Sequence, residues 1–195
     1  MAHVKRFLRL LSITAVLAAA TQLVGCSTPM AAPSSSIENT VKLRNAPLAP
    51  AAVGEFALAQ GKPAAKDKSV SIRGTALVSP VSDSLSKYLE ETLRKELQAA
   101  NLLDTNSGTQ ISGFLVDSDL DVPMGTGTGY LTARFVVKKA DRIAYDRELN
   151  TRLEWESSFL GAIAIPTAAQ NYAFLYKKLV GTLFDDPDFR QALAK

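Results

Sequence analysis

Apolar and polar residues alternate over five stretches of this chain, and each alternation predicts a strand. The predicted strands span 54–60, 69–77, 109–122, 130–139 and 142–157. The last two are separated only by Ala140-Asp141, which is short enough for a turn between antiparallel neighbours. The pattern therefore predicts a sheet built mainly from antiparallel pairs.

A helical spacing of apolar residues is clearest over 82–103. Its stripe consists of Leu85, Leu89, Leu93, Leu97 and Ala100. Ser82 or Asp83 is expected to cap the start of this helix, because short polar side chains can accept from the first free amides. Asn101 is expected to end it in a left-handed conformation, with Leu102 packing behind.

Two more helices are expected near the C-terminus. Thr167 and Gln170 form a capping box, which predicts a helix from Thr167 to about Phe184. Its buried face is expected to hold Tyr172, Leu175, Tyr176, Leu179 and Leu183. Asp186-Pro187 then begins a short last helix, since proline suits a first helical turn.

The order of elements is ββαβββα followed by the short C-terminal helix. Each helix has one apolar stripe and each strand one apolar face, which is typical of two layers packed around one core. We therefore expect the α+β class, as a two-layer sandwich of a mostly antiparallel sheet of about five strands with helices on one face.

Residues 27–52 show no sustained period and are rich in Ala, Pro and Ser. This composition predicts a flexible tether with a reach on the order of 30 Å. The predicted organisation is a signal peptide at 1–25, a modified cysteine with its tether at 26–52, and a folded domain at 53–195.

The first residues have the order of a secretory signal. Lys5, Arg6 and Arg9 precede an apolar stretch from Leu10 to Ala20, and small residues follow. The apolar stretch is shorter than the about 20 residues that a transmembrane helix needs. We expect this segment to be cleaved rather than to span a membrane.

Leu23, Val24, Gly25 and Cys26 resemble the lipobox of bacterial lipoproteins. The resemblance implies cleavage before Cys26, the only cysteine, and acylation of its sulfur and new amino group. The alternative is cleavage elsewhere, which would leave a free Cys26. In the lipoproteins that this motif resembles, an aspartate after the cysteine favours the inner membrane, whereas Ser27 favours the outer membrane, facing the periplasm.

The charge balance and the residue composition limit the partners and the catalytic or metal sites that we expect. Three of the 22 Lys and Arg residues and none of the 19 Asp and Glu residues lie in the signal, so the remaining chain is formally neutral. A neutral body gives no electrostatic reason to expect a nucleic-acid partner. The single histidine is His3, also in the signal, which excludes Ser-His-Asp and Cys-His catalysis and the usual zinc ligand sets. We expect no catalytic residue, metal or cofactor.

Three polar motifs are each interpreted as structural. The acids of 117–121 occupy alternate positions of a strand but lack the glycine and glutamate of a calcium loop. The glycines of 124–130 lead into a strand rather than a helix, so a hairpin connection is favoured over a phosphate loop. Glu154 and Glu156 are expected on a wet face opposite a core Trp155.

The stretch from Phe159 to Pro166 has no charged or hydrogen-bonding side chain, although it occupies the place of a connection. One interpretation is a buried strand end beneath the last long helix. The other is an exposed interaction loop for a protein or lipid partner, formed by Phe159, Leu160, Ile163 and Ile165. If the stretch is a strand, the two isoleucines lie on one side and should behave alike.

The helix SLSKYLEETLRKELQAANLL, the following ISGFLVD, the paired strands and the C-terminal helix resemble small lipoproteins of the Gram-negative outer membrane. The similar families are YajG-like lipoproteins, auxiliary lipoproteins of ABC-type lipid transporters and lipopolysaccharide-assembly lipoproteins. The resemblance covers most of 53–195 and rests on element order and helix pattern.

The resemblance implies a non-enzymatic lipoprotein, held in the membrane by its lipid anchor, that serves as an accessory or adaptor in envelope assembly or in lipid or lipopolysaccharide transport. Its partner would be an envelope protein or a lipid. Two alternatives remain open: a carboxylate-dependent cell-wall enzyme, and a structural lipoprotein that binds peptidoglycan.

Overall fold

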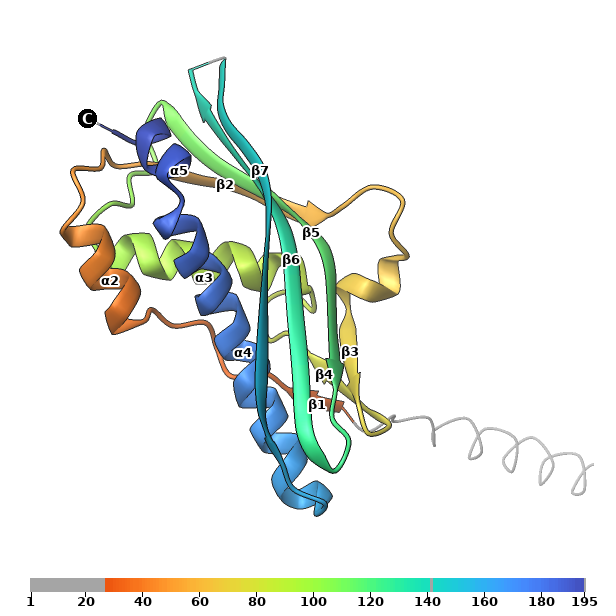
Figure 1. Cartoon of the computed structure of the whole chain (residues 1–195). Helices are drawn as coiled ribbons and strands as arrows, with labels where there is room; N and C mark the ends of the chain where they lie inside the picture. Colours follow the sequence, from red (N-terminus) through yellow and green to blue (C-terminus); the bar gives the residue numbers. More distant parts are fainter. Residues whose placement is uncertain (1–26, 141, 195) are drawn as a thin grey trace, which may run out of the picture.

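A four-stranded sheet forms the centre of the computed structural model, which describes residues 27–140 and 142–194 (Figure 1). Its order is β2-β5-β6-β7. The strands are β2 (Ala52–Leu58), β5 (Thr109–Asp121), β6 (Gly125–Lys139) and β7 (Arg142–Ser157). β2 runs parallel to β5, while β5, β6 and β7 pair antiparallel. The expected pairing of the strands on either side of Ala140 is confirmed.

Two long helices cover one face of this sheet. Helix α3 (Leu85–Ala99) packs against β2 and β5, and helix α4 (Gly161–Asp185) packs against β6 and β7. Helix α5 (Pro187–Ala192) continues along β7 after an N-cap at Asp186. All apolar residues predicted for the stripes of α3 and α4 are buried. The predicted α+β sandwich with helices on one face is confirmed.

A second, smaller sheet replaces the single strand predicted at 69–77. It has the order β1-β4-β3, with β1 at Ser27–Pro29, β3 at Ser69–Ile72 and β4 at Thr75–Val78. β3 and β4 form a hairpin whose turn residues, Arg73 and Gly74, have φ of 48° and 82°. Such left-handed pairs are favoured in two-residue hairpin turns, because their twist matches that of the strands.

The segment 27–52 is folded, so its interpretation as a flexible tether is wrong for the described residues. It contains β1 and helix α2 (Ile37–Arg44), which is capped by Ser36. The buried residues Met30, Leu43 and Leu48 anchor it in the core. These apolar residues are widely separated in the sequence, and therefore produce no local period. The folded part begins before residue 53.

Glu96 fastens α2 to the helical layer. Its carboxylate is buried and accepts from the Ser36 amide at 3.0 Å and from Asn39 Nδ2 at 2.9 Å. Asn39 also donates to the Lys177 carbonyl of α4 at 3.0 Å. Burial raises the pKa of Glu96, while these two donors and the charge of Lys177 oppose the rise. One polar cluster thus joins α2, α3 and α4.

Both long helices begin at positions that differ from those predicted. Ser84 caps α3, whereas Ser82 and Asp83 have positive φ in the preceding turn. Helix α4 begins at Gly161 rather than at Thr167, whose hydroxyl donates to the Ile163 carbonyl within the helix. Pro166 therefore lies inside α4, where it removes one backbone donor without ending the helix.

We predict that Glu96→Gln makes stability less dependent on pH. Because the folded pKa is raised, the folded protein holds a proton that the unfolded chain releases as pH rises above the ordinary glutamate value. Wild-type stability should therefore decrease as pH rises through that window, and the variant should lose most of this slope.

Urea unfolding measured across the window tests this prediction. The matched control is Glu91→Gln on the same helix, whose partly exposed carboxylate pairs with Lys95 and which should keep the wild-type slope. Identical slopes for wild type and Glu96→Gln would contradict the prediction.

Candidate interaction surface

The acidic motif of 117–121 forms the last five residues of β5. Asp117 accepts from the Tyr130 hydroxyl at 3.0 Å and lies 3.7 Å from Lys66. Asp119 and Asp121 are exposed. Among residues 27–140 and 142–194, no group of three or more His, Cys, Asp or Glu side chains has a geometry suited to a metal ion. A solvated strand face remains the interpretation of this motif.

The glycines of 124–130 are part of strand β6 rather than of a loop. A Cβ at Gly127 would lie 2.6 Å from the Trp155 ring, and one at Gly129 would lie 2.7 Å from Leu120. These glycines thus allow neighbouring side chains to cross the strand closely. Glu154 and Glu156 are exposed and Trp155 is partly buried, so the two acids share the wet face as expected.

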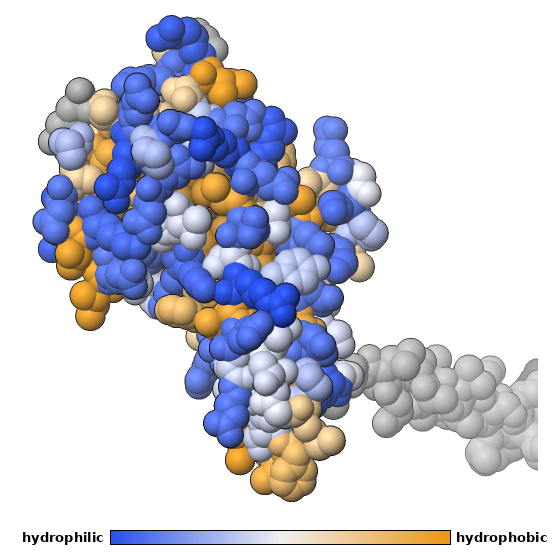
Figure 2. Space-filling model, in the orientation of Figure 1, coloured by the Kyte–Doolittle hydropathy of each residue, from blue (hydrophilic) through white to orange (hydrophobic). Residues whose placement is uncertain are grey.

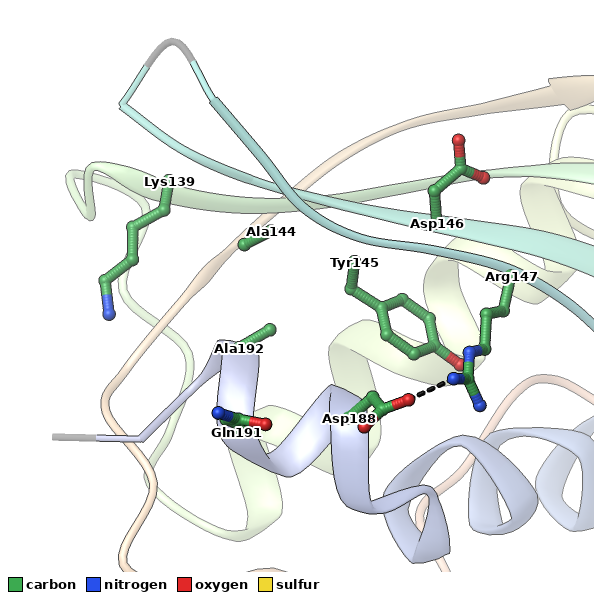
Figure 3. Close-up of a pocket in the computed structure, with 8 residues that line it drawn as sticks. All are labelled: Lys139, Ala144, Tyr145, Asp146, Arg147, Asp188, Gln191 and Ala192. Carbon is green, nitrogen blue, oxygen red and sulfur yellow. Dashed lines mark hydrogen bonds and ion pairs between the residues drawn. The ribbon is translucent and has the colours of Figure 1, made fainter.

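A groove of about 500 Å³ lies between β7 and α5 (Figure 3). It is lined by Lys139, Ala144, Tyr145, Asp146, Arg147, Asp188, Gln191 and Ala192. Tyr145 donates to Asp186 at 2.8 Å, and Arg147 binds Asp188. Burial and the neighbouring Asp186 raise the pKa of the Tyr145 hydroxyl. These contacts between β7 and the first residues of α5 and its cap hold α5 on the sheet.

Exposed large apolar side chains gather instead at the start of α4. We call this group the apolar tip: Met124, Phe159, Leu160 and Ile163, which are 73%, 70%, 47% and 54% exposed. Figure 2 shows hydrophobic surface at this end of the molecule, at the bottom of the view. Gly125 pairs with Ser157, which places Met124 beside the chain that leads to Phe159.

The structure contradicts one of the two interpretations of the stretch from Phe159 to Pro166. The buried strand end is wrong, because Gly161 to Pro166 are helical and three of the four candidate residues are exposed. Ile165 differs, since it is partly buried and packs on the core. The expectation that Ile163 and Ile165 behave alike required a strand and does not apply to a helix.

Arg73 holds the apolar tip in place. Its guanidinium donates to the carbonyl oxygens of Val122, Pro123, Ser158 and Phe159 at 2.7–3.1 Å and to Ser157 Oγ at 3.3 Å. One side chain thus joins the β3–β4 turn to the β5–β6 and β7–α4 connections. The turn divides the single strand predicted at 69–77, and the buried positions shift from even numbers at Val70 and Ile72 to an odd number at Leu77.

The lipobox residues Leu23, Val24, Gly25 and Cys26 lie outside the described residues. Ser27, the next residue, is opposite Ala76 in the parallel pair of β1 and β4. Within the described part of the chain, none of the helices combines the length and the apolar character needed to cross a membrane.

No protein-family model matches this chain, and no curated protein sequence matches it. Among solved structures, a Xanthomonas campestris protein of the DUF330 family is similar with a TM-score of 0.50 at 13% identity, covering 81% of this chain and 94% of that protein. At this identity the similarity shows the fold alone.

Two further structures are similar with TM-scores of 0.41. One is a minor lipoprotein of Acinetobacter baumannii, 11% identical over 73% of this chain and 94% of its own. The other is a Caulobacter crescentus protein inferred to be a lipoprotein, 12% identical over 54% of this chain and 83% of its own.

We predict different outcomes for the two isoleucines of this stretch. Ile163→Asp places a carboxylate on an exposed position near a helix N-terminus and should change the free energy of unfolding by less than about 0.5 kcal/mol. Ile165→Asp places it against the core and should cost about 1–3 kcal/mol. Chemical denaturation of both variants measures the difference, and equal losses would contradict the exposure of Ile163.

Proposed function

We propose that this protein is a lipid-anchored lipoprotein of the cell envelope, attached through Cys26 to the outer membrane and facing the periplasm. In this proposal it has no catalytic activity and acts as an accessory or adaptor in envelope assembly or in lipid or lipopolysaccharide transport. The observation that carries the proposal is the apolar tip, which exposes four large apolar side chains on an otherwise mixed surface.

The lipobox-like sequence supports the anchor. A signal with this order directs export, and acyl chains on Cys26 would hold the folded part at a membrane. The apolar tip supports the adaptor role, because exposed apolar groups of this kind mark surfaces that bind a protein or a lipid. Arg73 keeps the connections that carry the tip together, so the surface is preformed rather than assembled on binding.

The arrangement of acids favours this proposal over a carboxylate-dependent cell-wall enzyme. General acid–base catalysis needs a carboxylate within reach of a substrate and tuned by its surroundings. Burial raises the pKa of Glu96, but the side chain is fully enclosed, and its oxygens accept from Ser36 and Asn39. Glu154 and Glu156 are reachable, but they lie on an open sheet face.

The anchor makes a first prediction about position in the envelope. Cys26→Ala should abolish incorporation of a palmitate analogue in growing cells. Ser27→Asp should keep the label but move the protein to the inner-membrane fraction, while Ser27→Ala should leave both label and location unchanged. Equal labelling of wild type and Cys26→Ala would contradict lipidation at Cys26.

The adaptor role makes a second prediction. Affinity capture from detergent-solubilised envelopes, followed by mass spectrometry of proteins and lipids, should recover a specific envelope protein or lipid with the wild type. Binding to purified sacculi, measured in parallel, should be no greater than that of an unrelated periplasmic protein. Strong sacculus binding with no captured component would favour the structural peptidoglycan-binding alternative.

A further inference from the structure

The structure removes the distance that a flexible tether would put between the anchor and the folded part. Ser27 follows Cys26 directly and is already the first residue of β1. It is opposite Ala76, near the start of β4, so β1 enters the small sheet beside the turn at Arg73 and Gly74. If Cys26 carries the acyl chains, the bilayer surface lies next to this turn.

The same turn holds the apolar tip. Arg73 donates to the Phe159 carbonyl at 3.0 Å and to the Pro123 carbonyl, next to Met124, at 3.1 Å. In Figure 1, β1, the β3–β4 turn and the start of α4 all lie towards one end of the molecule, and the β6–β7 turn lies at the other. The anchor-bearing end and the apolar tip are therefore the same end.

The two segments that carry the tip also lack charge. Residues 122–133 contain no Asp, Glu, Lys or Arg, and neither do residues 157–176. The first charged side chain along β6 is Arg134, and the first along α4 is Lys177. Moving charged groups out of water is costly, so their absence from these two segments lowers the cost of placing the apolar tip in a lipid headgroup region, with the exposed Asp121 and Glu156 bordering it.

We propose that the apolar tip inserts into the surface of the bilayer leaflet that holds the acyl chains of Cys26. This inference rests on the lipid anchor of the proposed function and names the phospholipid surface as the ligand of the tip. A protein partner would have to enter between the body and a membrane to which it is directly joined. Contact of the tip with the bilayer fixes the orientation of the body, because the lipid anchor alone leaves the body free to rotate.

A single added cysteine tests the proposal, since Cys26 is the only cysteine of the chain and lipidation consumes its thiol. Ile163→Cys or Met124→Cys provides a tip position, and Ile143→Cys provides the matched control. Ile143 is 61% exposed and lies 14 residues along β7 from Ser157, roughly 45 Å away at the usual rise of a strand.

The experiment uses the lipidated full-length mature protein, labelled with a fluorophore and reconstituted into vesicles of phosphatidylethanolamine and phosphatidylglycerol. Bromines on the acyl chains of the phosphatidylethanolamine quench only a fluorophore that reaches the bilayer. We expect quenching by at least half at Ile163→Cys and Met124→Cys, and none at Ile143→Cys. Adding Phe159→Asp to either tip variant should reduce the quenching several-fold.

Each other outcome overturns the proposal. Absence of quenching at both tip positions would show that the tip stays in water. Equal quenching at all three positions would show that the body lies along the bilayer rather than on its tip. With detergent-extracted envelope proteins reconstituted into the same vesicles, a blue-shifted tip fluorophore that the bromolipids do not quench would show that a protein covers the tip.

Labelling of the wild-type protein, which has no added cysteine, separates this inference from the proposed function. A lipidated wild type offers no thiol and should take up no fluorophore. Labelling of wild-type protein would show that Cys26 is free, which would contradict the anchor and remove the reason for orienting the tip towards a membrane. An unlabelled wild type combined with unquenched tip positions would contradict the tip alone.

Discussion

The structure depends on covering one apolar face of a four-stranded sheet. Three buried tyrosines, Tyr88 from α3 and Tyr172 and Tyr176 from α4, fill much of the space between the layers with edge-on ring contacts. A buried phenol also needs a hydrogen-bond partner. Tyr172 finds Ser118 of β5 at 2.9 Å, and Tyr88 finds the carbonyl of Ala31 at 2.9 Å. Satisfying this core therefore draws the N-terminal segment onto the helices.

In the proposed lipid-anchored state, these attachments would control how the body is presented at the membrane. Tyr88 binds the chain just after β1, and Glu96 of α3 accepts from Asn39 of α2, so the segment from Ser27 to Arg44 is attached at several points. A segment attached at several points fixes both the position and the orientation of the body relative to Ser27, whereas a flexible tether of the same length would fix neither. The polar cluster around Glu96 therefore helps to fix where the apolar tip lies relative to Ser27.

The two ends of the long strands differ in chemistry. At the end near α5, Arg147 and Tyr145 join acids of the α5 cap and first turn, and Arg134 pairs with Asp146 at 2.6 Å. At the other end, a charge-free pair of segments is held by the guanidinium of Arg73. Backbone carbonyls and the Ser157 hydroxyl accept the donors of Arg73, so the two connections are held together without a charged partner for the guanidinium.

The sequence by itself determined the features that have a local signature. The leucine stripe of α3, the register-forming alternation of β6 and β7, and the Asp186-Pro187 start of α5 all agree with the structure, because each depends on residues within a few positions of one another. The signal and the lipobox-like motif are also local, and they supply the whole argument for an anchor.

The tertiary structure alone determined which residues that are far apart in the sequence come into contact. The folding of 27–52 depends on single contacts such as Asn39 with Glu96, which are 57 residues apart and leave no period in the sequence. The position of the tip depends on Arg73, whose partners lie 49 to 86 residues away. The sequence showed that Phe159 to Pro166 is apolar, but burial or exposure depended on which face of α4 the sheet required. Ile165 was turned towards the core and Ile163 towards the surroundings, since a helix separates neighbours that a strand would have aligned.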